Sequence, residues 1–300
     1  KAEGGRRKAE GDLRNAKTIS GGACPARLGT MKAATLSKTN MAYVDEGAGV
    51  PVLLVHGFPL DHTMWDAQIA ALSGRARVIA PDLRGFGQTP LVPGDAERGI
   101  SMEAYADDLA ELLDRIAVRE PIVLVGFSMG GYVAWQFLRK YGARLRALVQ
   151  CDTKAKADTD ETRAGRIKMA ENVAEWGSAR VAEMMGPKLI APATFEKKPE
   201  VVAAVRMMVE RAPPAGIAAA QRGMAARPDV TSSLPTIQVP TLVLVGEQDA
   251  ISPPAEMKEI ADAIPGAKYV VIPRAGHMTT MEKPDAVNSA FSLFIDKLRS

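Results

Sequence analysis

Residues 122–131, with the sequence IVLVGFSMGG, decide the fold of this chain. The last six residues match the pattern G-x-S-x-G, preceded by a Val/Leu run and followed by a helix-compatible stretch at 129–141. A serine at the tip of so sharp a turn takes a strained backbone conformation. A side chain two residues to either side would collide with the adjacent strand or helix, which is why glycines stand there. Because this strand–turn–helix context is the one the motif requires, Ser128 is predicted to be a nucleophile.

Short apolar runs alternate with helix-like segments on both sides of this motif. The expected strands are 51–55, 76–80, 122–125, 147–151, 242–245 and 269–272. The expected helices are 64–73, 101–117, 129–141, 255–264 and 284–298. Continuous Val, Leu and Ile runs are typical of parallel strands covered on both faces. The alternation predicts an α/β fold, a mainly parallel sheet flanked by helices, with one or two antiparallel edge strands from residues 32–46.

The alternation is interrupted at residues 153–234, which show helical periodicity and no convincing strand. Helices are expected to begin at Asp160 and Ser178, each acting as an N-cap, and at Pro199 or Glu200. An insertion of this length is usually functional. We therefore expect a helical cap over the carboxyl edge of the sheet. The α/β core would comprise residues 31–152 and 235–300.

The basic charge of the chain is concentrated in residues 1–30. The whole sequence has 38 Lys and Arg against 35 Asp and Glu, for a net charge of +3. Seven of the basic and three of the acidic residues lie in this segment, so the body is close to neutral. It therefore lacks the basic footprint of a nucleic-acid-binding protein. The segment is Gly-rich and expected to be disordered; it is interpreted as vector-derived or upstream-translated sequence, with a basic targeting arm as the alternative.

The composition also constrains the compartment. With 47% hydrophobic and 24% charged residues, the chain is typical of a soluble globular protein. No window approaches the roughly 20 consecutive apolar residues of a membrane helix. Two cysteines, Cys24 and Cys151, are too few for a disulfide framework or a four-cysteine zinc site. Their scarcity favours a reducing compartment, and we expect a cytoplasmic protein.

A serine hydroxyl becomes a useful nucleophile only when a base removes its proton. The chain offers three histidines. His277 follows the last expected strand and should lie at the same edge of the sheet as Ser128, so it is the predicted base. His56 follows the first buried strand, where a structural role is expected. His62 lies on a polar loop, where solvation is the default, and is the outside candidate.

The base in turn needs a carboxylate to orient it and to stabilise the imidazolium. Asp249 follows a strand and precedes His277 by 28 residues, so it is the predicted acid. Asp152, at the end of the preceding strand, is the rival and is interpreted as a structural cap. Glu247 lies two residues from Asp249 and should point elsewhere on the turn. The chain order of serine, acid and histidine is one that this motif is known to use.

An oxyanion formed at the attacked carbonyl needs backbone N–H donors. One comes from the residue after the nucleophile and one from the loop after an early strand. Met129 and Phe58 occupy those positions. Gly57 allows the backbone to turn inward beside the serine.

Five motifs together resemble those of the α/β-hydrolase fold superfamily, over residues 41–298. They are His56-Gly57-Phe58-Pro59, the loop 81–87, the turn 126–131, Gly246-Glu247-Gln248-Asp249 and Gly276-His277. The chain looks most like the bacterial group of carboxylesterases, 3-oxoadipate enol-lactonases and cofactor-free haloperoxidases or perhydrolases. Epoxide hydrolases and haloalkane dehalogenases of the superfamily carry aspartate in place of Ser128, so their chemistry is not expected here.

These roles predict a serine hydrolase that cleaves small carboxylic esters through an acyl-enzyme intermediate. No metal or organic cofactor is implied, and the expected partner is a small-molecule ester. Methionines suit a pliable apolar pocket, and four in the cap are predicted to contact substrate, with packing between cap helices as the alternative: Met184, Met185, Met207 and Met208. Three cap arginines could recognise a substrate carboxylate, as a lactonase requires: Arg206, Arg211 and Arg222.

Three other functions are compatible with the same residues. The triad could serve an enol-lactonase, or could form peracids from acetate and peroxide. A ligand-binding receptor with slow or vestigial hydrolysis is less favoured, because the set of serine, histidine and aspartate is intact.

Overall fold

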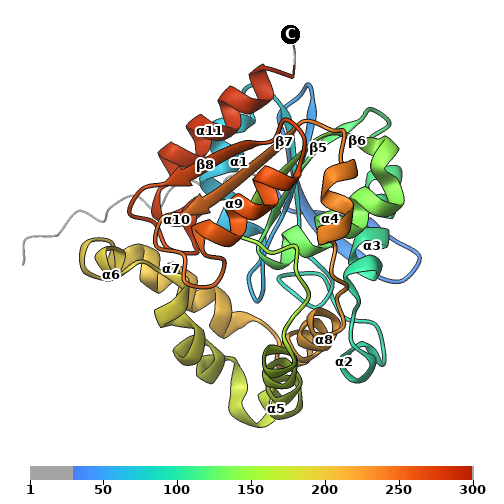
Figure 1. The fold of residues 1–300 in the computed structure, drawn as a ribbon. Coiled ribbons are helices and arrows are strands. Elements are labelled where there is room, and N and C mark those ends of the chain that lie inside the picture. The colour runs from blue at the N-terminus through green and yellow to red at the C-terminus, as the bar shows by residue number, and fades with distance from the viewer. Residues whose placement is uncertain (1–29, 299–300) are drawn as a thin grey trace, which may run out of the picture.

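An eight-stranded sheet runs through the described residues, 30–298, of the computed structural model (Figure 1). The spatial order is β1-β2-β4-β3-β5-β6-β7-β8, with β1–β2 and β2–β4 antiparallel and the other pairs parallel. The predicted fold class and antiparallel edge are confirmed, whereas residues 1–29 of the expected disordered segment lie outside the described residues. The strands are β1 (Lys32–Thr35), β2 (Asn40–Glu46), β3 (Pro51–Val55), β4 (Arg77–Pro81), β5 (Ile122–Phe127), β6 (Leu145–Cys151), β7 (Thr241–Gly246) and β8 (Lys268–Ile272).

Helices cover the sheet, and its central strands are buried along their whole length. Every residue of β3, β5 and β7 is buried, as expected for parallel strands between two helical layers. The flanking helices are α1 (Asp66–Leu72), α3 (Met102–Arg115), α4 (Met129–Tyr141), α9 (Pro254–Ala263) and α11 (Pro284–Asp296). None of the helices between residues 30 and 298 combines the length and apolar character needed to cross a membrane.

Short helical turns were not predicted from the sequence. They are α2 (Asp95–Arg98), α10 (Thr279–Glu282) and the 3-10 turns η1 (His62–Trp65), η2 (Gly142–Arg144) and η3 (Thr231–Thr236). The longest of them has six residues, too few for a helical period to be visible in a sequence.

Four helices are inserted between β6 and β7; we call them the inserted helices. They are α5 (Asp160–Leu189), α6 (Pro192–Lys197), α7 (Pro199–Arg211) and α8 (Pro214–Ala225). α5 is broken at Gly177, which has φ 73°, so the expected boundary near residue 178 is correct. The two expected N-caps are wrong. Thr159 rather than Asp160 accepts the N–H of Thr162, and the Ser178 hydroxyl donates to the carbonyl of Ala212 at 2.5 Å.

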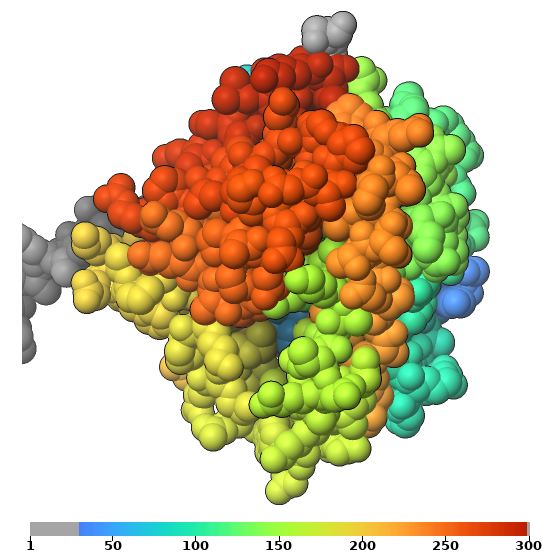
Figure 2. Space-filling model, in the orientation of Figure 1, coloured from blue at the N-terminus to red at the C-terminus, as the bar shows by residue number. Residues whose placement is uncertain are grey.

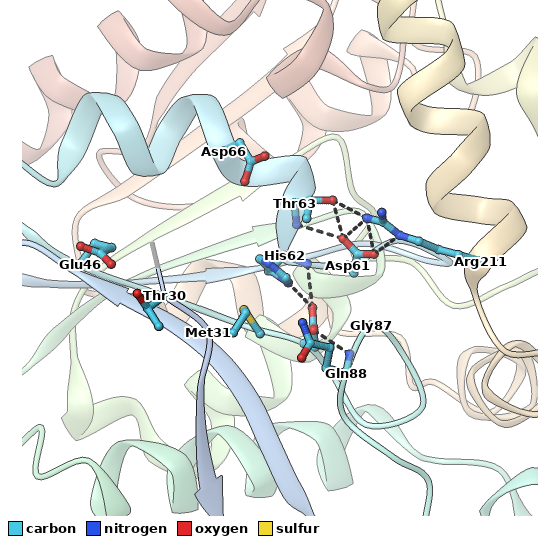
Figure 3. A pocket seen from close by; sticks show the side chains of 11 residues that line it. Thr30, Met31, Glu46, Asp61, His62, Thr63, Asp66, Gly87, Gln88 and Arg211 are labelled. Carbon is cyan, nitrogen blue, oxygen red and sulfur yellow. Dashed lines mark hydrogen bonds and ion pairs between the residues drawn. The ribbon is translucent and has the colours of Figure 1, made fainter. Parts of the chain in front are cut away.

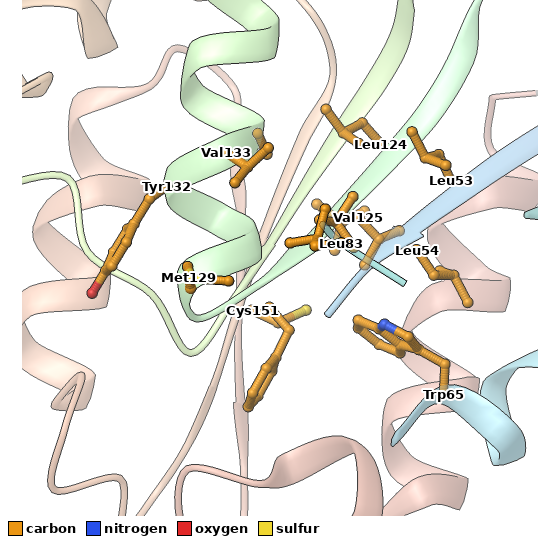
Figure 4. Packing of buried hydrophobic residues seen from close by; sticks show 14 of the residues in the cluster. Leu53, Leu54, Trp65, Leu83, Leu124, Val125, Met129, Tyr132, Val133 and Cys151 are labelled. Atoms are coloured by element: carbon orange, nitrogen blue, oxygen red, sulfur yellow. The ribbon is translucent and has the colours of Figure 1, made fainter. Parts of the chain in front are cut away.

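A cluster of buried apolar side chains supports the β5–α4 turn. Figure 4 shows Leu124 and Val125 of β5 in one cluster with Leu53 of β3 and Val133 of α4. All four residues have 0% exposed surface. Because burying one such side chain stabilises a fold by about 1.5–3 kcal/mol, this cluster holds β5 and α4 firmly on either side of the turn.

The inserted helices lie against the body through α8. The N–H of Ile100 donates to the carbonyl of Ala219 at 3.1 Å, and a Cβ added at Gly216 would lie 1.9 Å from the carbonyl oxygen of Gly85. The two parts do not meet everywhere: Figure 2 shows a hollow between the lime and yellow residues of the α5 region and the orange residues of the body, with blue atoms from early in the chain at its floor.

Replacing two helical glycines by alanine should have opposite effects on the free energy of unfolding, because only one of them, in α8, contacts the body. Gly216→Ala places a methyl group against the Gly85 backbone and should lower the free energy of unfolding by about 1–3 kcal/mol, as overpacking does. Gly165→Ala is the control, because nothing lies within 4 Å of a Cβ at that exposed position of α5. There the alanine should raise stability by up to about 1 kcal/mol. Calorimetric Tm values measure both; a Gly216→Ala protein as stable as wild type would contradict the close approach.

Candidate active site

Ser128 lies at the turn between β5 and α4 in the strained conformation that the sequence predicts. Its backbone has φ 52° and ψ −114°. A Cβ at Gly126 would lie 2.5 Å from the carbonyl oxygen of Gly130, and one at Gly130 would lie 2.3 Å from the carbonyl oxygen of Val55. The hydroxyl of Thr153 donates to the Ser128 carbonyl at 2.7 Å. The strand and the helix therefore approach so closely that only glycine fits beside the serine.

The structure brings the predicted nucleophile, base and acid together. His277 lies between β8 and α10, and its Nε2 is 2.9 Å from Ser128 Oγ. Its Nδ1 is 2.8 Å from Oδ2 of Asp249, in the loop after β7. His277 and Asp249 are buried, whereas Ser128 is partly exposed. The three groups thus form one continuous hydrogen-bond chain that ends at an accessible hydroxyl.

Asp249 is held as an ionised acceptor. Burial alone would raise the pKa of this carboxyl, but the adjacent His277 and the backbone N–H groups around it lower the pKa below its ordinary value. Those N–H groups belong to Ile251 and Ser252 and donate to Oδ1 at 2.8 and 2.9 Å. Because Oδ1 is fixed by two donors, Oδ2 is left to accept from the imidazole. A carboxylate in this place sets the tautomer of its histidine.

Asp152, the rival acid, makes different contacts. It is fully buried, and its carboxyl oxygens accept from the N–H of Gly246 at 2.9 Å and from the hydroxyl of Thr279 at 2.5 Å. His277 pairs with Asp249 instead. The interpretation of Asp152 as a strand-end acceptor therefore agrees with the structure.

Glu282, which was not predicted from the sequence, is a carboxylate that anchors the loop carrying the imidazole. Glu282 has no exposed surface. One oxygen accepts from the N–H of Gly276 at 2.8 Å, and the other from the N–H of Ala191 at 2.9 Å and the hydroxyl of Thr194 at 2.6 Å. It ties the loop before His277 to the start of α6. No pattern in the sequence distinguishes it from surface glutamates, because its partners come from distant segments.

The predicted oxyanion donors flank the serine on either side. A Cβ at Gly57 would lie 2.7 Å from the Phe127 ring and 3.1 Å from Ser128 Cβ, so the loop after β3 runs directly beside the nucleophile. Within the described residues, the N–H groups of Phe58 and Met129 make none of the turn and loop hydrogen bonds that their neighbours make. Their role as donors to an oxyanion stays a prediction.

The other two histidines are structural. His56 is fully buried; its Nε2 accepts the N–H of Leu83 at 2.9 Å, and its Nδ1 lies 2.8 Å from the carbonyl of Gly57. The expectation of a solvated His62 is wrong, because its Nδ1 lies 2.7 Å from Oδ1 of the buried Asp82. Burial would lower the pKa of His62, but the bond to Asp82 raises it.

A cavity of about 1030 Å³ lies beside His62 (Figure 3), and Ser128 is not among the residues that line it. Its lining is acidic, and the two carboxylates closest to His62, those of Asp61 and Asp82, already have protein partners. The Asp61 carboxylate accepts two hydrogen bonds from the guanidinium of Arg211, at 2.7 and 2.8 Å. The Asp82 carboxylate accepts hydrogen bonds from His62 and from the N–H of Gln88. We do not identify this cluster as a metal site, because a cation would have to displace these donors.

The three arginines considered for carboxylate recognition are all engaged with protein groups. Arg206 donates to Glu210 at 2.6 Å, and Arg222 to the carbonyl of Ala96 at 3.1 Å. Arg211 binds Asp61, as above. None of these guanidinium groups is held ready for a substrate carboxylate.

The four predicted substrate-contacting methionines are spread over the inserted helices. Met207 and Met208 line a cavity of about 280 Å³ together with Met64 and Met281. Met184 is 41% exposed, and Met185 packs partly buried against the core. Ser128 does not line that cavity, and the contact of the four with substrate stays a prediction.

Comparison with known proteins identifies the family of this fold and site. A family model described as the alpha/beta hydrolase fold matches residues 50–284. A thermophilic esterase from Thermogutta terrifontis has a TM-score of 0.86 at 48% identity, covering 90% of this chain and 100% of that chain. The AB hydrolase superfamily protein YisY of Bacillus subtilis is 30% identical, over 83% of this chain and 93% of the relative. The 3-oxoadipate enol-lactonase 1 of Acinetobacter baylyi is 26% identical, over 80% and 86%. The chain therefore belongs to the alpha/beta hydrolase fold family, as its five motifs indicated.

Proposed function

We propose that this alpha/beta hydrolase is a serine hydrolase that cleaves small carboxylic esters. The observation that carries the proposal is the hydrogen-bond chain from Asp249 through His277 to Ser128, with distances of 2.8 and 2.9 Å. A histidine so placed can remove the serine proton as the hydroxyl attacks a carbonyl. The strained turn exposes that hydroxyl at the carboxyl edge of the sheet.

In this mechanism His277 takes the proton of Ser128, and backbone N–H groups stabilise the negative charge that forms on the carbonyl oxygen. As Ser128 Oγ bonds to the ester carbonyl carbon, its proton passes to Nε2 of His277, and the imidazolium is stabilised by Asp249. The N–H groups of Phe58 and Met129 stabilise the tetrahedral oxyanion. Collapse expels the alcohol, which takes the proton from His277. Water then attacks the acyl-enzyme with the same histidine as base, releasing the acid and restoring the serine.

Two features support small esters as the substrate class. The esterase of Thermogutta terrifontis is 48% identical over 90% of this chain. The arginines that a carboxylate-bearing lactone would use are paired with protein groups, Arg211 with the buried Asp61. The enol-lactonase likeness, at 26% identity, makes lactone hydrolysis by the same triad the second candidate.

The inserted helices would act as a cap, with residues 153–234 as its extent. The hollow in Figure 2 between the α5 region and the body is the expected entrance for substrate. A free, buried Cys151 and the near-neutral body support a cytoplasmic enzyme that acts on small molecules.

Ser128→Ala tests the nucleophile. Wild-type protein should hydrolyse short-chain p-nitrophenyl esters with multiple turnover, and the alanine variant should lose at least about 10³-fold in kcat, because no acyl-enzyme can form. A fluorophosphonate should label the wild-type protein at Ser128, as peptide mapping would show. Absence of turnover on every short ester would remove the proposal.

Asp249→Asn tests the acid, with Glu247→Gln as its matched control. The asparagine cannot hold the imidazole in its productive tautomer, so kcat should fall roughly 10³–10⁴-fold with little change in KM. Glu247 is exposed, and its carboxylate accepts only the N–H of Arg274 among the described residues, so its variant should stay within about twofold of wild type. Comparable losses in both variants would show that Asp249 has no special role.

A third experiment ranks the substrates. Values of kcat/KM for p-nitrophenyl acetate should exceed those for an enol-lactone that carries a carboxylate, and those for peracid formation from acetate and peroxide. The reverse order would favour the enol-lactonase or perhydrolase alternative. Ligand binding with hydrolysis slower than one turnover per hour would favour the receptor.

A further inference from the structure

Asp152 is a buried carboxyl that the mechanism above leaves unused. It follows β6, immediately beside the loop that carries Asp249. One carboxyl oxygen of Asp152, one of Asp249 and one ring nitrogen of His277 all lie within 4.8 Å of one another. All three residues are buried. Two carboxyl groups therefore share one water-excluded site with a single imidazole.

Hydrogen bonds to its backbone and to its side chain hold Asp152 in an unusual backbone conformation. Its φ of 49° is in the left-handed region, which residues other than glycine keep only where the surroundings enforce it. Its N–H donates to the carbonyl of Leu244 at 2.9 Å, and its carbonyl accepts from the hydroxyl of Ser252 at 3.1 Å. Its side chain reaches the N–H of Gly246 and the hydroxyl of Thr279. These partners precede or follow Asp249 and His277 closely, so Asp152 joins the two loops of the site.

Two adjacent buried carboxyl groups do not ionise together. The groups that face Asp152 are Asp249, His277 and the Cys151 thiol. Asp249 keeps its charge because the imidazole and two backbone N–H groups stabilise it. Burial and the charge of Asp249 raise the pKa of Asp152 well above its ordinary value, and burial also raises the pKa of Cys151, leaving the thiol neutral. Asp249 therefore carries the negative charge of the pair, and Asp152 keeps its proton.

We propose that Asp152 is a positioning residue, a neutral carboxylic acid that donates a hydrogen bond to the Asp249 carboxylate and thereby orients it toward His277. The closeness of the two buried carboxyl groups, whose oxygens lie within 4.8 Å of each other, supports such a hydrogen bond. The inference rests on the proposed serine-hydrolase function. Asp152 acts through Asp249 and touches neither the substrate nor the reacting atoms.

The added donor has a predictable effect on the base. A hydrogen bond from a neutral donor disperses the negative charge of Asp249. Asp249 then stabilises the imidazolium formed during the reaction less than it would without that hydrogen bond. Removing the donor should make His277 easier to protonate, whereas replacing it with another neutral donor should change little.

Two variants separate these cases. Asp152→Asn keeps a neutral donor, so kcat should stay within about threefold of wild type and the acid limb of the kcat/KM profile should not move. Asp152→Ala removes the donor, so kcat should fall roughly 10-fold or more at constant KM. Its acid limb should move upward by roughly half to one pH unit, the value of one hydrogen bond. Both rates are expressed per mole of monodisperse protein from gel filtration.

Two outcomes would overturn the proposal. If Asp152→Asn moves the acid limb to lower pH, Asp152 is ionised in the wild type, because the variant then removes a negative charge beside the imidazolium. If Asp152→Ala loses stability but keeps the kcat and pH profile of wild type, the residue is structural only.

Infrared difference spectroscopy decides the protonation state even if the alanine variant does not fold. At pH 8, the spectrum of wild type minus Asp152→Asn should show the carbonyl stretch of a protonated carboxyl. Asp108→Asn is the control, since burial raises the pKa of Asp108 only to about 6, against the pull of Arg84, and this carboxyl is ionised at pH 8. Absence of the band for Asp152 overturns the proposal. The spectra require no turnover, so failure of the ester assays alone would refute the proposed function and not the protonation state.

Discussion

The close approach of β5 to α4 is the constraint on which the rest of the site depends. The path between the strand and the helix passes the backbone of β3 so tightly that Cβ atoms at Gly126 and Gly130 would overlap carbonyl oxygens. With no room to relax, Ser128 takes a positive φ and presents its hydroxyl beyond the sheet edge. The apolar cluster around Leu124 and Val133 holds both elements in place, so packing around the turn maintains the strained backbone of Ser128.

Buried carboxyl groups then position the imidazole. Asp249 accepts from Nδ1 of His277, and Glu282 holds the backbone just before that histidine. Asp152 joins the β7 strand end to α10. A buried polar group is tolerated only when its hydrogen bonds are satisfied, and each of these carboxyls has at least two protein partners. The imidazole is thus oriented by a network in which one carboxylate is charged and its neighbour is neutral.

The inserted helices are joined to this network and to the body by contacts of different kinds. α8 approaches the backbone at Gly85 through a helical glycine. Arg211, at the end of α7, makes a two-pronged ion pair with Asp61, three residues after Phe58. Glu282 connects the histidine loop to α6. These contacts involve both the expected oxyanion loop and the histidine loop. Movement of the inserted helices would therefore shift the backbone on both sides of Ser128.

Several features of this protein have a signal that is local in the sequence. The glycines around Ser128, the continuous apolar strands and the strand-end positions of Asp249 and His277 can be read along the chain, because steric fit and parallel-sheet geometry leave few alternatives. Glu282, the pairing of His62 with Asp82 and the contacts of Asp152 could not be read in this way. Whether a glutamate, histidine or aspartate is solvated or buried depends on partners far away along the chain. Ala191 is 91 residues from Glu282, and Thr279 is 127 residues from Asp152. Only the tertiary structure decided those roles, because it alone sets which polar groups lose water and what replaces it.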